Sequence, residues 1–162
     1  MSLNNLIEWI YQTPLSNAIR ETAWVVPAVQ SLHILAIAVV LGAALISDLR
    51  LARLFAVDEP VHTIVRRYLP WSCVSLAVLL LTGLTMCVGE PDRVLVNQIF
   101  WMRMGLVVGV FALTLGLRRP FLDPGFRPAS AWRGRHAKGL AWLSLLMWAA
   151  VVVCGRWIAY GI

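Results

Sequence analysis

Four long apolar stretches, separated by short polar segments, dominate the pattern of this chain. They cover residues 24–47, 68–88, 98–117 and 139–158. A helix needs about 20 mostly apolar residues to cross a bilayer, and each stretch reaches or approaches that length. The pattern therefore predicts an all-α membrane protein, built as a four-transmembrane-helix bundle.

The segment before the first stretch is amphipathic. Between residues 2 and 12 the apolar side chains fall on one helical face, and they are Leu3, Leu6, Ile7 and Ile10. This pattern predicts an N-terminal helix that lies in the membrane interface. Thr13-Pro14 ends that helix, and a short helix over residues 16–21 leads into the first span. We expect residues 1–21 to form interfacial helices within a single transmembrane domain over residues 1–162.

The amino-acid composition also indicates a protein that lies in a membrane. Of the 162 residues, 60% are hydrophobic and 14% are charged, whereas soluble domains have roughly 25% charged residues. A soluble protein of this size could not bury so much apolar surface, so lipid must cover part of it. The formal net charge of +6 comes mostly from short loops between the spans, which argues against nucleic acid as a partner. The three cysteines show no CxxC or CxxCH spacing, which argues against zinc and covalent c-type haem.

Basic residues also predict the orientation. The loops at residues 50–67 and 118–138 hold ten of the fourteen Lys and Arg residues. By the positive-inside rule these two loops face the cytoplasm, and both termini then lie outside the bacterial inner (cytoplasmic) membrane. The first twenty residues lack the basic and apolar regions of a cleavable signal peptide.

Three ionisable side chains inside the spans fall in the outer leaflet: His33, Arg103 and Arg156. Charge in a membrane is costly unless it is paired, hydrated or able to reach the headgroups. His33 lies about 13 Å along the helix from Trp24, too deep for an imidazole to reach the surface. Gln30, one turn earlier on the same face, is expected to orient His33. Because no acid lies in that half of any span, the two cations indicate an anionic or electron-rich ligand.

Three ligands fit this chemistry. His33 could ligate a b-type haem whose propionates are neutralised by Arg103 and Arg156. A quinone could bind His33 and one arginine, and a lipid phosphate could bind the arginines alone. A standard bis-histidine haem within one chain is disfavoured, because His62 and His136 map to the cytoplasmic side. Those two histidines are expected to be solvated residues of loops or helix ends.

Simpler explanations of the same residues stay open. Arg103 and Arg156 lie within roughly 6–9 Å of the outer boundary, so their long side chains can extend to the headgroups. His33 could be a neutral histidine that is hydrogen-bonded to a neighbouring helix. At the inner end, Asp48 is expected to form a surface ion-pair cluster with Arg50 and Arg53.

Copper is a further alternative, with His33 as one metal ligand. Soft donors lie near the same leaflet, namely Met86, Cys87, Met102, Met104 and Cys154. Cys87 and Cys154 lie at similar depth and could form a disulfide if their helices touch. Methionine and cysteine are also ordinary fillers of membrane cores, so these residues are no specific signal.

Four short segments resemble one protein family. Residues 27–33, 48–51 and 155–160, together with Pro70-Trp71, look like an uncharacterised bacterial family of four-span integral membrane proteins. That family is distantly similar in layout to the membrane domain of copper-resistance D proteins, whose histidine pattern is not reproduced here. The resemblance implies a four-helix bundle with His33 and Arg156 at motif positions, whereas the family more often has lysine at the position of Arg103.

No stand-alone catalytic motif is present, so the protein is at most an electron-transfer subunit. The leading hypothesis is a small inner-membrane, redox-associated subunit that holds haem b or quinone at an outer-leaflet site of His33, Gln30, Arg103 and Arg156. A non-catalytic scaffold or assembly subunit and a copper-handling membrane protein are the alternatives. Expected partners are the lipid bilayer and either other membrane subunits or a second copy of the chain.

Overall fold

The computed structural model describes residues 3–118 and 135–160, and all the regular structure there is helical. The elements in chain order are α1 (Leu3–Tyr11), α2 (Pro14–Glu21), α3 (Val25–Leu51), α4 (Val61–Gly89), α5 (Pro91–Leu95), α6 (Gln98–Arg118) and α7 (Arg135–Tyr160). The helices α3, α4, α6 and α7 are long and apolar enough to cross a membrane. The predicted all-α membrane fold with four spans is confirmed.

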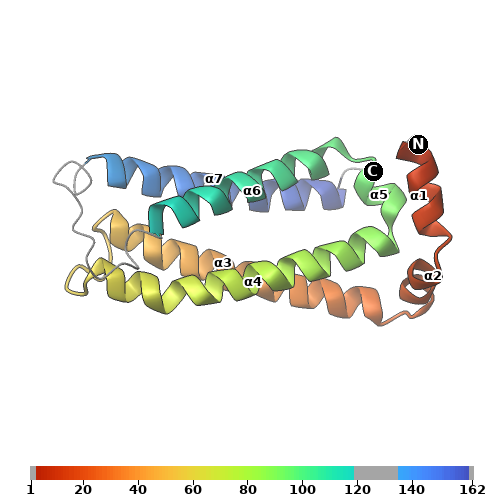
Figure 1. The fold of residues 1–162 in the computed structure, drawn as a ribbon, viewed down its shortest axis with the longest axis horizontal. Helices are drawn as coiled ribbons and strands as arrows, with labels where there is room; N and C mark the ends of the chain where they lie inside the picture. The colour runs from red at the N-terminus through yellow and green to blue at the C-terminus, as the bar shows by residue number, and fades with distance from the viewer. Residues whose placement is uncertain (1–2, 119–134, 161–162) are drawn as a thin grey trace.

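The four long helices form a bundle of two layers, with α3 and α4 in one layer and α6 and α7 in the other (Figure 1). Contact is most extensive between α3 and α4 and between α6 and α7, and α7 also packs against α3. Each helix runs antiparallel to the one before it, because the connections between them are short. Side chains on the outward faces are left for lipid to cover.

The helices α1, α2 and α5 lie at the end of the bundle where α3 begins, and α1 lies across the bundle axis (Figure 1). The predicted break at Thr13-Pro14 is confirmed, since Thr13 Oγ1 accepts a hydrogen bond of 3.3 Å from the N–H of Ser16 and caps α2. α2 sits closely on α4, where a Cβ atom at Gly89 would lie only 2.9 Å from Ile19. Glycine at this position therefore allows the close approach.

Three long helices extend beyond the apolar stretches that predicted them. α3 continues to Leu51, α4 begins at Val61 and α7 begins at Arg135. Backbone hydrogen bonding within a helix does not depend on lipid, so these helices continue until the chain reverses. Between α3 and α4, Arg50 Nε donates a hydrogen bond of 2.8 Å to the carbonyl of Glu59 and holds the connecting loop.

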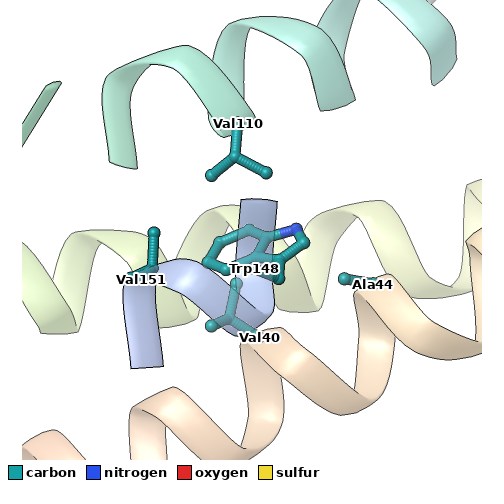
Figure 2. Close-up of a cluster of buried hydrophobic side chains, with 5 residues drawn as sticks. All are labelled: Val40, Ala44, Val110, Trp148 and Val151. Atoms are coloured by element: carbon teal, nitrogen blue, oxygen red, sulfur yellow. The ribbon is translucent and has the colours of Figure 1, made fainter. Parts of the chain in front are cut away.

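A buried apolar cluster fills the middle of the bundle (Figure 2). It consists of Val40, Ala44, Val110, Trp148 and Val151, which come from α3, α6 and α7. Trp148 is only 4% exposed, and its indole lies between Val110 on one side and the α3 residues on the other (Figure 2). One large ring thus fills the space where three helices meet.

We predict that Trp148→Ala lowers the free energy of unfolding by about 3–5 kcal/mol, because it leaves a cavity that the helices cannot close. Reversible unfolding in detergent micelles or bicelles would measure the change. Trp142→Ala is the matched control on the same helix, since Trp142 is 51% exposed. Equal losses for the two variants would contradict the central role of Trp148.

Candidate functional site

His33 is fixed by a contact between α3 and α4. Its Nδ1 lies 2.7 Å from Thr82 Oγ1, and its Cε1 would lie 3.8 Å from a Cβ atom at Gly83. α4 therefore presents two features to the imidazole. One is the hydroxyl group of Thr82, and the other is the bare backbone of Gly83. Thr82 is buried, while His33 is half-buried.

The hydrogen bonds of Thr82 define the tautomer of a neutral His33. The hydroxyl of Thr82 lies 2.7 Å from the carbonyl oxygen of Val78 and donates its single hydrogen within its own helix. Thr82 Oγ1 must then accept from the imidazole, so the hydrogen of His33 is on Nδ1. Nε2 keeps its lone pair, which can accept a hydrogen bond, take up a proton or bind a metal.

Arg103 lies between α6 and α7. A Cβ atom at Gly155 would lie 2.9 Å from Arg103 Cζ, so the guanidinium occupies the space that a side chain on α7 would fill. Arg103 Nε is buried and has no hydrogen-bond partner among the described residues. His33 on α3 and Arg103 on α6 both lie in the bundle half where α3 begins, so the two layers place an imidazole and a guanidinium at a similar level.

The other two predicted site residues lie differently. Gln30 is exposed and makes no hydrogen bond to His33, whose partner is Thr82. Gln30 instead lines a cavity of about 30 Å³ between α2, α3 and α4, which is room for about one water molecule. Arg156 follows Gly155 in α7 and its side chain is exposed. The geometry therefore centres on His33, Thr82 and Arg103.

No observation on the described residues supports a haem at His33. Ligand pockets of that scale measure about 300–1,000 Å³, whereas His33 and Arg103 pack closely over Gly83 and Gly155.

The copper alternative gains no support from the geometry. Within residues 3–118 and 135–160, no group of three or more His, Cys, Asp and Glu side chains could hold a metal ion. Of the methionines considered as soft donors, Met102 is exposed. Cys87 and Cys154 are free thiols.

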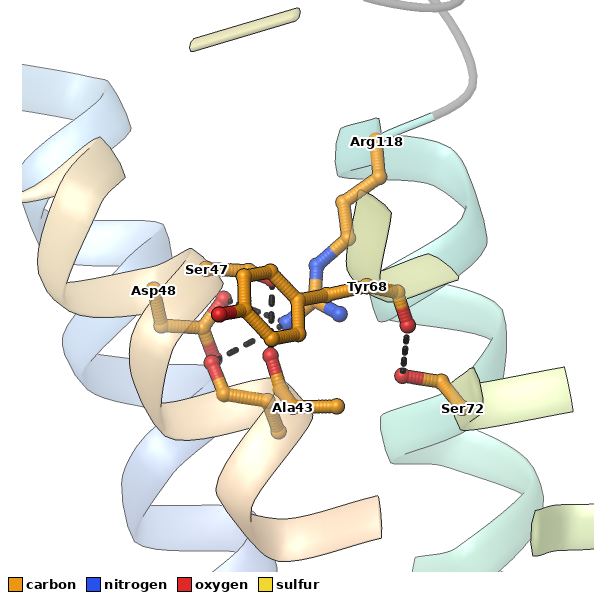
Figure 3. A network of polar contacts seen from close by, with 7 residues as sticks. Ala43, Ser47, Asp48, Tyr68, Ser72 and Arg118 are labelled. Atoms are coloured by element: carbon orange, nitrogen blue, oxygen red, sulfur yellow. Dashed lines mark hydrogen bonds and ion pairs between the residues drawn. The ribbon is translucent and has the colours of Figure 1, made fainter. Parts of the chain in front are cut away.

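A second polar cluster, which the sequence did not predict, lies at the other end of the spans. Arg118 Nη2 donates a hydrogen bond of 2.9 Å to Asp48 Oδ1, and both side chains are 1% exposed. The same nitrogen lies 3.3 Å from the carbonyl oxygen of Ala44. Figure 3 shows the long side chain of Arg118 reaching from α6 to α3.

The expected surface cluster of Asp48 with Arg50 and Arg53 is wrong. Asp48 faces the bundle interior, because it lies four residues after Ala44 on the buried face of α3. Arg50 binds carbonyl groups of the loop between α3 and α4. Arg53 is exposed with a φ of 61°. Charges that are neighbours in sequence therefore point in different directions from the helix end.

We predict that Asp48→Leu and Arg118→Met each lower the free energy of unfolding by about 3–5 kcal/mol, because each leaves one buried charge without its partner. The double variant should recover most of that loss, since it removes both charges. Unfolding measurements on the four proteins of this double-mutant cycle test the coupling.

The pair Arg67–Glu59 offers a control for this cycle. Its atoms lie 3.7 Å apart and its side chains are 56% and 46% exposed, so Arg67→Met should cost less than about 1 kcal/mol. Additive losses in the Asp48 and Arg118 cycle would show that the two charges are not coupled.

Comparison with known proteins gives one match. Residues 7–161 fit the model of a family described as a family of unknown function (DUF6644). The curated proteins and the solved structures contain no match to the chain. Because the family model covers nearly the whole sequence, including every helix that could span a membrane, the chain belongs to this family of unknown function.

Proposed function

We propose that this multi-pass membrane protein is a redox-associated subunit of an inner-membrane complex that binds the head group of a quinone. One observation carries the proposal: a histidine with a free Nε2 lone pair lies in the same half of the bundle as an arginine whose buried Nε has no hydrogen-bond partner among the described residues. These groups supply a proton acceptor and a cationic hydrogen-bond donor. A quinol needs both, because it presents hydroxyl groups that become anionic on deprotonation.

Access from the bilayer favours a quinone over haem. His33 and Arg103 are both half-buried, and the helix surfaces around them are apolar. A head group carried by a lipid-soluble tail can approach such residues from the membrane without a large closed pocket.

The chain's own residues would act on the ligand as follows. His33 Nε2 accepts a hydrogen bond from a quinol hydroxyl and can take up its proton. Thr82 keeps the ring oriented, since its hydroxyl accepts from Nδ1–H in both charge states of the imidazole. Arg103 donates to the oxygen on which negative charge develops and stabilises it in a medium of low dielectric constant. This chain would bind the quinol and take up its proton. The electrons would pass to a partner subunit.

Quinone retention provides the test. We expect His33→Phe and Arg103→Leu each to reduce the amount of quinone that copurifies with the protein by at least tenfold, the size expected for loss of one charge-assisted hydrogen bond of about 1.5–3 kcal/mol. Solvent extraction and chromatography of protein in lipid nanodiscs would measure it. A photoreactive quinone analogue should label α3 or α6 near these residues.

Two exposed residues at the other end of α4 serve as matched controls. His62→Phe and Arg66→Leu make the same chemical changes outside the site and should retain the wild-type amount of quinone. The scaffold hypothesis expects all four variants to retain equal amounts. A Soret band in the absorbance spectrum, after expression with ample haem, would favour haem and contradict the quinone proposal.

The orientation is part of the proposal and has its own test. If the basic segments after α3 and α6 face the cytoplasm, both chain ends lie outside. Alkaline phosphatase fused after residue 162 should then be active, and the same enzyme inserted after Asp58 should be inactive. The reverse activities would place the His33 and Arg103 site in the cytoplasmic half of the membrane.

A further inference from the structure

The cluster around Asp48 and Arg118 contains buried polar atoms that the protein itself does not satisfy. Six atoms make no hydrogen bond of full geometry among the described residues: Asp48 Oδ2, Thr114 Oγ1, Arg118 Nε, Arg118 Nη1, Ser144 Oγ and Trp148 Nε1. Of these, Ser144 still interacts with the Asp48 carboxylate. The side chains that carry the six atoms are all at most 4% exposed. Lipid cannot hydrogen-bond to any of them, so the ion pair alone leaves the cluster incomplete.

Three helices bring these atoms to one level of the bundle. Thr114 lies four residues before Arg118 on α6, and Ser144 lies four residues before Trp148 on α7, so each pair shares a helix face. Ser144 approaches the carboxylate of Asp48 on α3. The indole nitrogen of Trp148 lies on the side of its ring that is nearer Ala44 (Figure 2), and the carbonyl of Ala44 is itself a partner of Arg118.

The chemistry of the unsatisfied atoms limits what can complete the cluster. Arg118 and Trp148 can only donate hydrogen bonds, Asp48 Oδ2 can only accept, and the two hydroxyl groups can do both. An anion would satisfy the donors but would be repelled by the Asp48 carboxylate. A molecule of water accepts and donates at once, and buried waters typically make about three hydrogen bonds to such groups.

We propose that the Asp48–Arg118 cluster binds ordered water inside the membrane-spanning part of the bundle. The water bridges Asp48 Oδ2 and the hydroxyl groups of Thr114 and Ser144 to the free donors of Arg118 and Trp148. This hydrated site is separate from the His33 and Arg103 site and does not depend on a quinone. On the side toward His33, Trp148 packs with the apolar side chains of Val40, Val110 and Val151.

Hydroxyl-radical footprinting of the protein in lipid nanodiscs tests this proposal. A short X-ray pulse converts bound water to radicals, which oxidise the side chains that touch it. Trp148 should be oxidised although it is buried from bulk solvent. Met147, the next residue, is also readily oxidised, but its side chain packs against Gly109 on α6 and not against the Asp48–Arg118 cluster, so it should react several-fold more slowly. Oxidation of Trp148 no faster than that of Met147 would overturn the proposal.

A pair of substitutions separates bound water from general leakage of water into the bundle. Thr114→Val and Ser144→Ala together remove two groups that hold the water and keep the ion pair. Oxidation of Trp148 should fall several-fold in this variant, with helix content by circular dichroism unchanged. Unchanged oxidation of Trp148 in the folded variant would contradict the assigned water site. If the variant does not fold, the comparison of Trp148 with Met147 in the wild-type protein decides the question.

Discussion

The ion pair between Asp48 and Arg118 is the interaction on which the half of this bundle near the end of α3 depends. Extensive helix packing joins α3 to α4 and α6 to α7, and α7 alone makes substantial contact between the two layers of long helices. Arg118 adds a link from α6 to α3 at a place where both charges are removed from solvent. Neither charge is stable there without the other, so the pair fixes the relative position of the two layers.

Two pairs of ionisable side chains lie at different levels of the described bundle, and an apolar cluster lies between them. His33 and Arg103 occupy the level near the start of α3, and Asp48 and Arg118 occupy the level near its end. The cluster around Trp148 separates the two.

Glycine residues make room for the side chains of His33 and Arg103. Gly155 leaves the space that the Arg103 guanidinium fills, and Gly83 lies beside the ring of His33. The spacing of the glycines indicates close helix contact, but it does not tell which side chain approaches each of them. For the same reason the sequence suggested Gln30 as the partner of His33, whereas His33 donates its hydrogen bond to Thr82 on the neighbouring helix.

The sequence by itself determined the class of fold, the four spans, the break at Thr13-Pro14 and the depth of His33 and Arg103, because these follow from local hydrophobicity, proline chemistry and helical rise. It did not determine the pairing of Asp48 with Arg118, whose residues lie 70 positions apart. Asp48 and Arg118 both lie next to basic loops, and charged residues in such a sequence context are expected to be exposed to solvent. Only the packing of α3 against α7, with α6 alongside, decides that these charges face inward, since burial depends on which helix faces meet and not on neighbours in the chain.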